Sequence, residues 1–237
     1  MKYRNAFTLI ELIVVVIILL LIITIIVPWI ESMHNISPKI LCSNNLKQIA
    51  LACQTYKDTY GSYPPAFVVD AEGQPLYSWR VLILPFLEYR TLYDQFHLDE
   101  PWDSEHNKKL ISKKPPIFQC HYERRKDKNR DYLYSYYAMV VGANTISSGF
   151  NCVKPEEITD GMDQTLLIVE TRHKIQWSSP QDVSFDALDK GVTLFYKPPL
   201  ADDGIGAYHN RGANVVMIDG TVKYLSPKTK PETLKAL

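Results

Sequence analysis

Residues 4–30, RNAFTLIELIVVVIILLLIITIIVPWI, decide how this chain is organised. From Leu12 to Val27 every residue is apolar except Thr24. When the run is extended to residues 7–30, it approaches the roughly 20 residues that a helix needs to cross a bilayer. The sequence therefore predicts a transmembrane helix at residues 7–30.

The charges that flank this apolar run predict its orientation. Lys2 and Arg4 precede it, and no further Lys or Arg occurs before Lys39. Because positively charged flanks stay on the cytoplasmic side of a membrane, we expect Met1 in the cytoplasm and everything after Trp29 outside it.

Two ordinary kinds of N-terminal segment, a secretory signal peptide and a plain signal anchor, do not account fully for the apolar run. A secretory signal peptide has a shorter apolar region, of about 7–15 residues, and ends in a small-residue cleavage site. This run is longer and ends at Val27-Pro28-Trp29. A plain signal anchor gives no reason for Glu11, since a carboxylate inside a membrane segment is costly and usually functional.

The string from Arg4 to Leu12, RNAFTLIEL, resembles the signal of type IV prepilins and type II secretion pseudopilins. In that family a membrane peptidase cuts before the Phe and methylates the new amino terminus, and Glu is the fifth mature residue. The resemblance implies cleavage between Ala6 and Phe7, methylation of Phe7, and a role in recognition or assembly for Glu11. Ala6 stands where the family usually has Gly.

The same resemblance implies a single-pass protein of the bacterial inner membrane, with a cytoplasmic N-terminus and an extracytoplasmic C-terminal domain at the cell surface or in a filament. The expected partners are the inner membrane, the prepilin peptidase, homologous pilin-like subunits and their assembly machinery. In a filament, Glu11 of one subunit can meet the amino terminus of its neighbour. That pairing offsets the cost of holding a charge in lipid.

The pattern divides the chain into four segments. Residues 1–6 form the leader, 7–30 the transmembrane helix, 31–60 an amphipathic stalk helix, and 61–237 an extracytoplasmic globular domain. Steps of four and three separate the apolar residues of the stalk, which indicates one helix face. This stripe comprises Cys42, Leu46, Ile49, Cys53, Tyr56 and Tyr60. A separate core helix that begins at Pro38 would bury the same face.

We expect an α+β, pilin-like fold, in which the long N-terminal helix packs on an antiparallel sheet with extra helices. Ser78 can cap a helix that reaches Phe96, and a short helix follows Asp103. Residues 132–141 and 165–170 have strand character.

The clearest local prediction is a hairpin at residues 214–225. Two β-prone runs flank Asp219-Gly220, the preferred pair for a two-residue type I′ turn. Such a turn pairs Met217 with Val222 and places both on one buried face.

A series of motifs runs through the rest of the chain in a recognisable order. They are Cys42-Ser43-Asn44-Asn45-Leu46-Lys47-Gln48, Tyr60-Gly61-Ser62-Tyr63-Pro64-Pro65, Ser78-Trp79-Arg80, Pro101-Trp102-Asp103-Ser104, Phe118-Gln119-Cys120, Thr159-Asp160-Gly161, His209, Gly212-Ala213-Asn214-Val215 and Asp219-Gly220-Thr221-Val222. This order is similar to a large bacterial family of prepilin-like proteins whose outer region is the domain of unknown function 1559. The resemblance implies export and a pilin-like fold and names no reaction.

Four cysteines in an exported protein favour disulfides. Cys42 and Cys53 lie on one predicted helix, about 16 Å apart, and cannot bond to each other, so each needs Cys120 or Cys152. Cys42 and Cys120 both lie in motifs of the resembled family, which implies that they pair. Buried free thiols are the alternative, because cysteine packs well in protein cores.

No catalytic motif or metal-ligand spacing occurs in the sequence, so we expect neither an enzyme nor a bound metal. One group of residues is typical of either a ligand site or tight turns: Asp160, Gly161, His209, Gly212, Asn214, Asp219 and Gly220. Asp202 and Asp203 lie shortly before His209 in the sequence. Oxygen-rich loops of this kind suit Ca²⁺. Turn chemistry explains the same residues without a ligand.

The charge balance argues against a nucleic-acid partner. The formal net charge is zero, with 26 basic and 26 acidic residues, and Asp127 and Asp131 dilute the basic stretch at 124–130. Two functions remain: a subunit or minor component of a type IV pilus or type II secretion-type filament, or a surface-anchored binding module that uses the signal only for export and anchoring.

Overall fold

The computed structural model of the chain describes residues 9–34, 38–120, 133–151, 153–193, 204–208 and 212–237, with the backbone alone for residues 25–34 and 38. The chain divides into two compact units, Met1–Ser37 and Pro38–Leu237. The described part of the first unit is helix α1, and the strands lie in the second.

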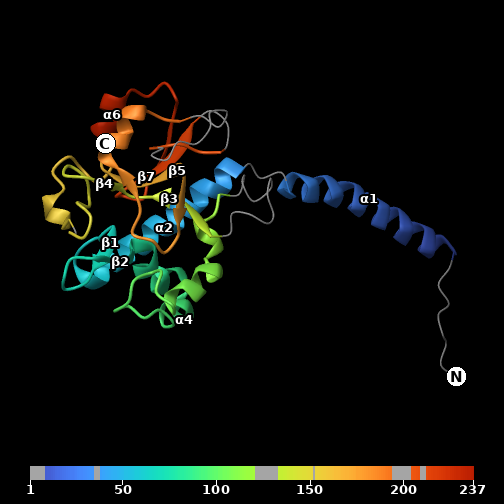
Figure 1. Cartoon of the computed structure of the whole chain (residues 1–237). Coiled ribbons are helices and arrows are strands. Elements are labelled where there is room, and N and C mark those ends of the chain that lie inside the picture. The colour runs from blue at the N-terminus through green and yellow to red at the C-terminus, as the bar shows by residue number, and fades with distance from the viewer. Residues whose placement is uncertain (1–8, 35–37, 121–132, 152, 194–203, 209–211) are drawn as a thin grey trace. The chain divides into compact units, whose positions relative to one another are not determined.

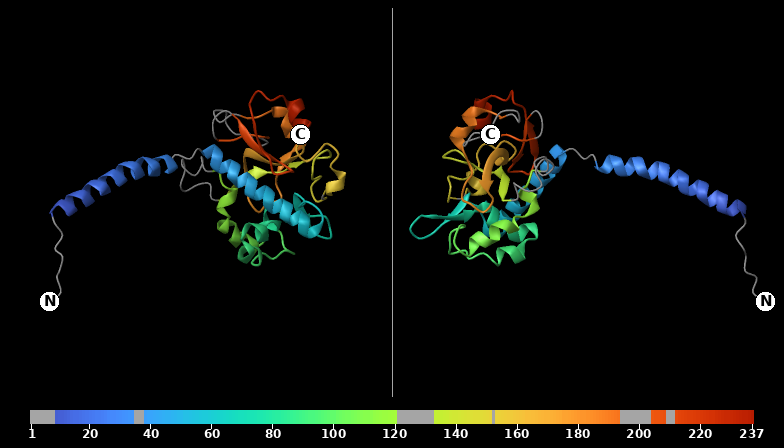
Figure 2. Two further views of the ribbon diagram at one scale, coloured as in Figure 1. Left: turned by 180° about the vertical axis from the view of Figure 1, so that it is seen from behind. Right: turned by 45° about the vertical axis from the view of Figure 1, so that its right-hand side comes forward.

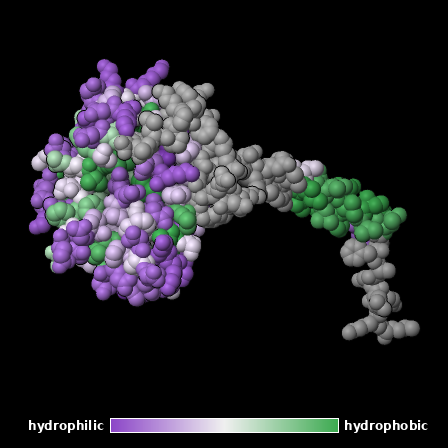
Figure 3. All heavy atoms as spheres, in the orientation of Figure 1, coloured by the Kyte–Doolittle hydropathy of each residue, from purple (hydrophilic) through white to green (hydrophobic). Residues whose placement is uncertain are grey.

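Helix α1 spans Leu9–His34. Its large apolar side chains between Leu9 and Ile23 are 43–74% exposed, and Figure 3 shows this stretch as a continuous apolar surface. The hydroxyl of Thr24 donates to the Leu21 carbonyl at 2.8 Å, so this polar side chain is satisfied within the helix. Within the ranges given above, no helix combines the length and the hydropathy that a membrane span requires.

Helix α2 spans Pro38–Tyr60 and buries one side in the second unit. The fully buried members of the predicted stripe are Cys42, Leu46, Ile49 and Cys53. Tyr60 at the end of the stripe is 62% exposed, and its ring packs 4.6 Å from that of Tyr56. The helix ends at Gly61, which has a φ of +83°, because a residue in the left-handed region cannot continue a right-handed helix.

The main sheet has four antiparallel strands in the order β3-β5-β7-β8. Its strands are β3 (Tyr134–Ala138), β5 (Leu166–Gln176), β7 (Ala213–Met217) and β8 (Val222–Leu225). β5 and β7 lie at the centre of this sheet, next to α2 (Figure 1). The strands predicted at 132–141 and 165–170 are therefore present, although β5 continues to Gln176.

Both faces of this sheet are covered, as the two views of Figure 2 indicate. On one face α2 packs along β7, and Leu46 and Val216 belong to the same core cluster. On the other face lie η5 (Phe185–Lys190) and α6 (Pro231–Lys235), where Leu188 and Leu234 share a second cluster with Val215. Strand β7 is consequently buried along its whole length.

The hairpin between β7 and β8 corrects the predicted register by one residue. Val216, rather than Met217, lies opposite Val222. The Gly220 N–H donates to the Met217 carbonyl and the Met217 N–H to the Thr221 carbonyl, both at 2.9 Å. Of the turn residues only Gly220 has a positive φ, +88°, whereas a type I′ turn needs two. The loop therefore has three residues, and Met217 faces away from Val222.

The single helix predicted from Ser78 to Phe96 is wrong, although its cap is confirmed. The Ser78 hydroxyl accepts from the Arg80 N–H at 3.2 Å and begins α3. Three short pieces follow: α3 (Trp79–Leu82), η1 (Leu84–Leu87) and α4 (Arg90–Tyr93). Pro85 near the start of η1 removes a backbone donor, and Glu88 turns the chain with a φ of +64°.

Short elements complete the second unit. They are β1 (Phe67–Val69), β2 (Pro75–Ser78), η2 (Asn107–Lys113), η3 (Pro116–Phe118), β4 (Val140–Val141), η4 (Pro155–Glu157) and β6 (Val183–Ser184). The short helix predicted after Asp103 corresponds to η2. Helices and an antiparallel sheet in separate layers confirm the predicted α+β class.

Candidate functional site

The predicted processing signal overlaps the start of helix α1. Glu11 lies in the first turn of this helix, where the helix dipole favours a negative charge, and its side chain is exposed. Ala6 and Phe7, between which cleavage is predicted, lie outside the described residues.

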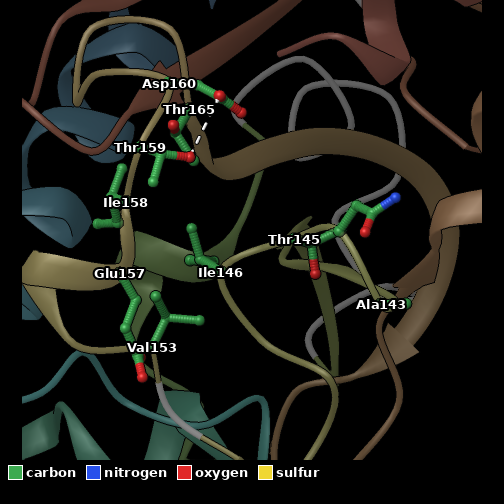
Figure 4. Close-up of a pocket in the computed structure, with 10 residues that line it drawn as sticks. Ala143, Thr145, Ile146, Val153, Glu157, Ile158, Thr159, Asp160 and Thr165 are labelled. Carbon is green, nitrogen blue, oxygen red and sulfur yellow. Dashed lines mark hydrogen bonds between the residues drawn. The ribbon is translucent and has the colours of Figure 1, made fainter.

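One predicted site residue of the second unit, Asp160, lines a cavity of about 510 Å³. Figure 4 shows Thr159, Asp160 and Thr165 together at one end of it and Glu157 with Val153 at the other. The lining comprises Ala143, Asn144, Thr145, Ile146, Val153, Glu157, Ile158, Thr159, Asp160 and Thr165. The predicted Asp160-Gly161 turn therefore borders a cavity rather than flat surface.

Hydrogen bonds within the loops use many of the polar atoms around this cavity. Thr165 donates its hydroxyl to the Gly161 carbonyl at 2.9 Å, and Thr145 donates to the Ser147 carbonyl at 2.8 Å. Glu157 accepts from the Lys154 N–H at 2.8 Å, which fixes the start of η4. These contacts are those of turns and caps, so the geometry favours turn chemistry over a built ligand site.

The structure brings together only part of the predicted ligand cluster. The Asp219 N–H donates to the Met162 carbonyl at 3.1 Å, which joins the Asp160-Gly161 loop to the Asp219-Gly220 turn. Asn214 lies at the other end of β7 and points elsewhere. Its N–H and its side-chain amide donate to the Glu170 carboxylate at 2.6 and 3.2 Å.

The remaining members of the cluster contribute no described site. Gly212 precedes β7, with a φ of +156°, and a Cβ there would meet the Leu225 carbonyl. His209, Asp202 and Asp203 lie outside the described residues, as does the basic stretch at 124–130. Among the residues that the structure describes, no three His, Cys, Asp or Glu side chains converge as a metal site would require.

Calcium is expected to leave the melting temperature of the full chain unchanged. A site occupied at 100 times its Kd adds about 2.7 kcal/mol of stability, which raises the melting temperature of a domain of this size by roughly 5–10 °C. Differential scanning calorimetry with millimolar CaCl₂ or with chelator measures the shift. A rise that is lost in Asp160→Asn would contradict the turn interpretation.

The cysteine pair implied by the family resemblance is brought together. Sγ of Cys42 on α2 and Sγ of Cys120 after η3 lie 3.7 Å apart, and both side chains are buried. The three described cysteines carry free thiols, and Cys53 is buried apart from this pair. Cys152 lies outside the described residues.

The buried thiols are poor nucleophiles. The hydrogen bond with the Cys120 thiol, followed by burial, raises the pKa of Cys42 far above its usual range. Burial alone raises the pKa of Cys53. Because the thiolate is the reactive form, neither group has the character of a catalytic cysteine.

Several residues around the cavity carry no signal in the sequence. Thr145 lies in the loop after β4 and Glu157 ends η4, and both residue types are ordinary at such positions. Only the fold places them beside Asp160.

Comparison with known families finds two matches in the chain. Residues 1–27 match the prokaryotic N-terminal methylation motif, and residues 39–155 match the family described as "Protein of unknown function (DUF1559)". No curated protein and no solved structure matches the chain significantly. The motif implies processing by prepilin peptidase and a membrane-anchored, surface-exposed protein. The chain therefore joins an N-terminal methylation motif of the kind found in type IV pilin-like proteins to a region that is similar to the DUF1559 family.

Proposed function

We propose that this protein is a subunit or minor component of a type IV pilus or type II secretion-type filament. The observation that carries the proposal is the methylation motif at residues 1–27, with Glu11 in the first turn of an apolar helix. Prepilin peptidase would cut between Ala6 and Phe7 and methylate the amine of Phe7. The role is structural rather than catalytic.

The apolar surface of α1 supports anchoring in the inner membrane through residues 7–30. Its large apolar side chains from Leu9 to Ile23 are exposed on all sides of the helix, and a helix that is apolar all round requires an apolar environment. Lys2 and Arg4 hold the N-terminus in the cytoplasm. The second unit, Pro38–Leu237, is then extracytoplasmic.

Glu11 supports assembly in preference to simple anchoring. A carboxylate in the hydrocarbon region is costly unless it is paired, and the methylated amine of a neighbouring Phe7 is a cation at the same depth. The pair sets the axial position of one subunit against the next, and the apolar helix surfaces then pack as the filament core.

A surface-anchored binding module is the second candidate. The one observation behind it is the volume of the cavity beside Asp160, about 510 Å³, which lies in the range of roughly 300–1,000 Å³ that is usual for small-molecule sites. In that case the signal would serve only for export and anchoring, and Glu11 would be dispensable.

Glu11→Ala is expected to lower the amount of protein in sheared filaments about tenfold or more, while the protein still accumulates in the membrane. The loss follows because the amine of the neighbouring subunit is left unpaired in lipid. Immunoblots of sheared and membrane fractions from the native host measure the ratio. Glu72→Ala, at an exposed acidic residue of the second unit, is the matched control.

Mass spectrometry of the membrane-extracted protein tests the processing step in parallel. A methylated Phe7 at the amino terminus is the expected result. An intact Met1, or wild-type protein that is absent from sheared filaments, would mean that the protein is an anchored binding module. An unchanged filament fraction of Glu11→Ala would contradict a role of Glu11 in assembly.

A further inference from the structure

A second cavity, of about 590 Å³, lies at the edge of the main sheet. One wall is formed by the chain that leads into and along η2, and the other by the paired ends of β3 and β5. Its lining includes Trp102, Asp103, Lys108, Ile111, Tyr134 and Gln176. We call it the Trp102 groove; it shares no lining residue with the cavity beside Asp160.

The sheet wall of the Trp102 groove combines an aromatic ring with polar side chains. Tyr134 of β3 lies directly opposite Gln176 of β5, so their side chains point to the same face of the sheet. Lys174, two residues earlier on β5, places its ammonium group 5.5 Å from the centre of the Tyr134 ring. The ring is half-buried.

The opposite wall is held rigidly by buried hydrogen bonds. The Asn107 amide donates to the carbonyls of His97, Glu100 and Pro101 at 2.8, 3.2 and 3.0 Å. These contacts fix the loop that leads directly into Trp102. The side chain of Asn107 is fully buried, so the loop is tied to the body of the domain.

Two further hydrogen bonds tie the walls to each other. The indole N–H of Trp177, at the end of β5, donates to the Ile111 carbonyl at 2.9 Å. Nζ of Lys114 donates to the Tyr134 carbonyl at 2.9 Å. The groove is therefore a preformed feature, which lowers the cost of binding.

The polar groups that line the groove are available to a ligand. Within the part of the chain that the structure describes, the Trp102 indole N–H, the Asp103 carboxylate and the Gln176 amide have no hydrogen-bond partner. Trp102 is half-buried and Asp103 is exposed. An aromatic body with free donors and acceptors around it is the mixture typical of small-molecule sites.

The chemistry of the lining selects a class of ligand. A purely apolar ligand would desolvate the Asp103 carboxylate and the Gln176 amide without compensation. The Asp103 carboxylate would repel a polyanion. Lys108 balances the negative charge of Asp103, so these two side chains together give the groove no net charge that would select an anion. A pyranose ring has an apolar C–H face for an aromatic ring and hydroxyl groups at its edge for a carboxylate and an amide.

We propose that the Trp102 groove binds a neutral saccharide. The Trp102 ring covers the apolar face of a sugar, the Asp103 carboxylate accepts hydrogen bonds from its hydroxyls, and the Gln176 amide both donates and accepts. This site does not depend on filament assembly, so Glu11→Ala leaves it intact.

The test is a titration of the full chain in a detergent without a sugar headgroup. The saccharides are cellohexaose, maltohexaose and chitohexaose, measured by calorimetry and by tryptophan fluorescence. Trp79 and Trp177 are fully buried, so among the tryptophan side chains that the structure describes Trp102 is the one that a ligand can reach. At least one saccharide is expected to bind and to change the emission of Trp102.

Variants decide whether the binding occurs in the groove. Trp102→Ala is expected to weaken affinity about tenfold or more, and Gln176→Ala should weaken it as well. Trp102→Phe, which keeps an aromatic ring, should retain most of the affinity and guards against a folding defect. Phe150→Ala changes an aromatic residue that is 56% exposed elsewhere and should leave the binding unchanged.

Three results would overturn the proposal. One is the absence of binding by all three saccharides at about 10 mM. Another is equal affinity of the wild type, Trp102→Ala and Gln176→Ala for the bound saccharide. The third is a Trp102-dependent response to decanoate or polygalacturonate with none to the neutral sugars.

Discussion

Replacing Arg80 by methionine is expected to lower the free energy of unfolding by about 3–5 kcal/mol, because the change leaves a carboxylate uncompensated in the core. Nη2 of Arg80 lies 2.8 Å from Oδ1 of Asp182, and the two side chains are 0% and 1% exposed. The partners are far apart in sequence and join the segment after β2 to the loop before β6.

Further hydrogen bonds hold both members of this ion pair. Nη2 of Arg80 also donates to the Tyr137 carbonyl at 2.7 Å. Oδ1 of Asp182 accepts from the Met139 N–H at 2.9 Å and from the Trp79 indole at 3.3 Å. Losing Arg80 would remove its hydrogen bond to the Tyr137 carbonyl as well as the countercharge of Asp182, which places the expected cost among the large values for single substitutions.

Burial disfavours the charged form of both Arg80 and Asp182. It raises the pKa of Asp182 and lowers the pKa of Arg80, and the attraction between them opposes both shifts. Because the pKa of Asp182 is higher in the folded than in the unfolded chain, the folded state takes up this proton first as the pH falls. Protonation of Asp182 alone therefore does not drive unfolding in acid.

The measurement is thermal or urea unfolding of the full chain, with a double-mutant cycle. For a domain of this size the melting temperature of Arg80→Met should fall by roughly 6–20 °C. Arg80→Met/Asp182→Leu should recover part of the loss, because an apolar pair replaces an unpaired charge. Arg90→Ala breaks an exposed pair of 2.9 Å, with side chains 70% and 55% exposed, and should cost no more than about 0.5 kcal/mol.

Strict additivity of the two single substitutions would contradict this account. So would a cost for Arg80→Met no larger than that for Arg90→Ala. Either outcome would mean that water reaches the pair and that its charges are already solvated.

Periodicity alone predicted the parts of the fold that depend on local sequence. The buried face of α2 was predicted because residues three and four apart share a helix face. The apolar run that forms much of α1 was evident from its length and unbroken hydropathy. The helix boundary at Gly61 followed from backbone freedom at one residue.

The register of the β7–β8 hairpin could not be predicted from the local sequence alone. Asp219-Gly220 is compatible with a two-residue turn, but burial of β7 on both faces removes the alternation that would have fixed the pairing. The side-chain amide of Gln54 on α2 also donates to the Ile218 carbonyl at 2.9 Å. That tertiary contact stabilises the three-residue loop and cannot be inferred from residues 214–225.

The candidate sites also divide into one that the local sequence predicts and others that depend on tertiary structure. The motif around Glu11 is contiguous, so a sequence comparison finds it whole. The Trp102 groove is assembled from three segments, and its polar groups become a set only when β3 pairs with β5. The pairing of Arg80 with Asp182 leaves no pattern in the sequence, since neither residue type is expected in a core.

Oxidation of Cys42 and Cys120 to a disulfide is expected to raise the free energy of unfolding by about 4 kcal/mol, because the bond closes a long loop in the unfolded chain. The two Sγ atoms are already 3.7 Å apart in the buried interior. If the second unit is extracytoplasmic, as proposed above, it meets an oxidising environment. The bond would tie α2 to the segment after η3.

The raised pKa of Cys42 decides when this bond can form. In the folded domain the thiol stays protonated at neutral pH, since its hydrogen bond with Cys120 and its burial both disfavour the thiolate. Exchange needs the thiolate, so oxidation should occur during folding after export, before α2 closes over the pair. Protein folded under reducing conditions is then expected to oxidise slowly.

Alkylation under denaturing conditions and urea unfolding together test the pair. Protein from the native host should gain the mass of two extra alkyl groups at Cys42 and Cys120 only when reductant is added first, and reduction should lower its stability by about 4 kcal/mol. Cys42→Ala should abolish the effect of reductant, whereas Cys53→Ala, which removes a buried thiol outside the pair, should lower stability by packing alone and keep that effect. Equal alkylation with and without reductant would mean that both sulfurs remain thiols, and the 3.7 Å contact would then be core packing without a covalent consequence.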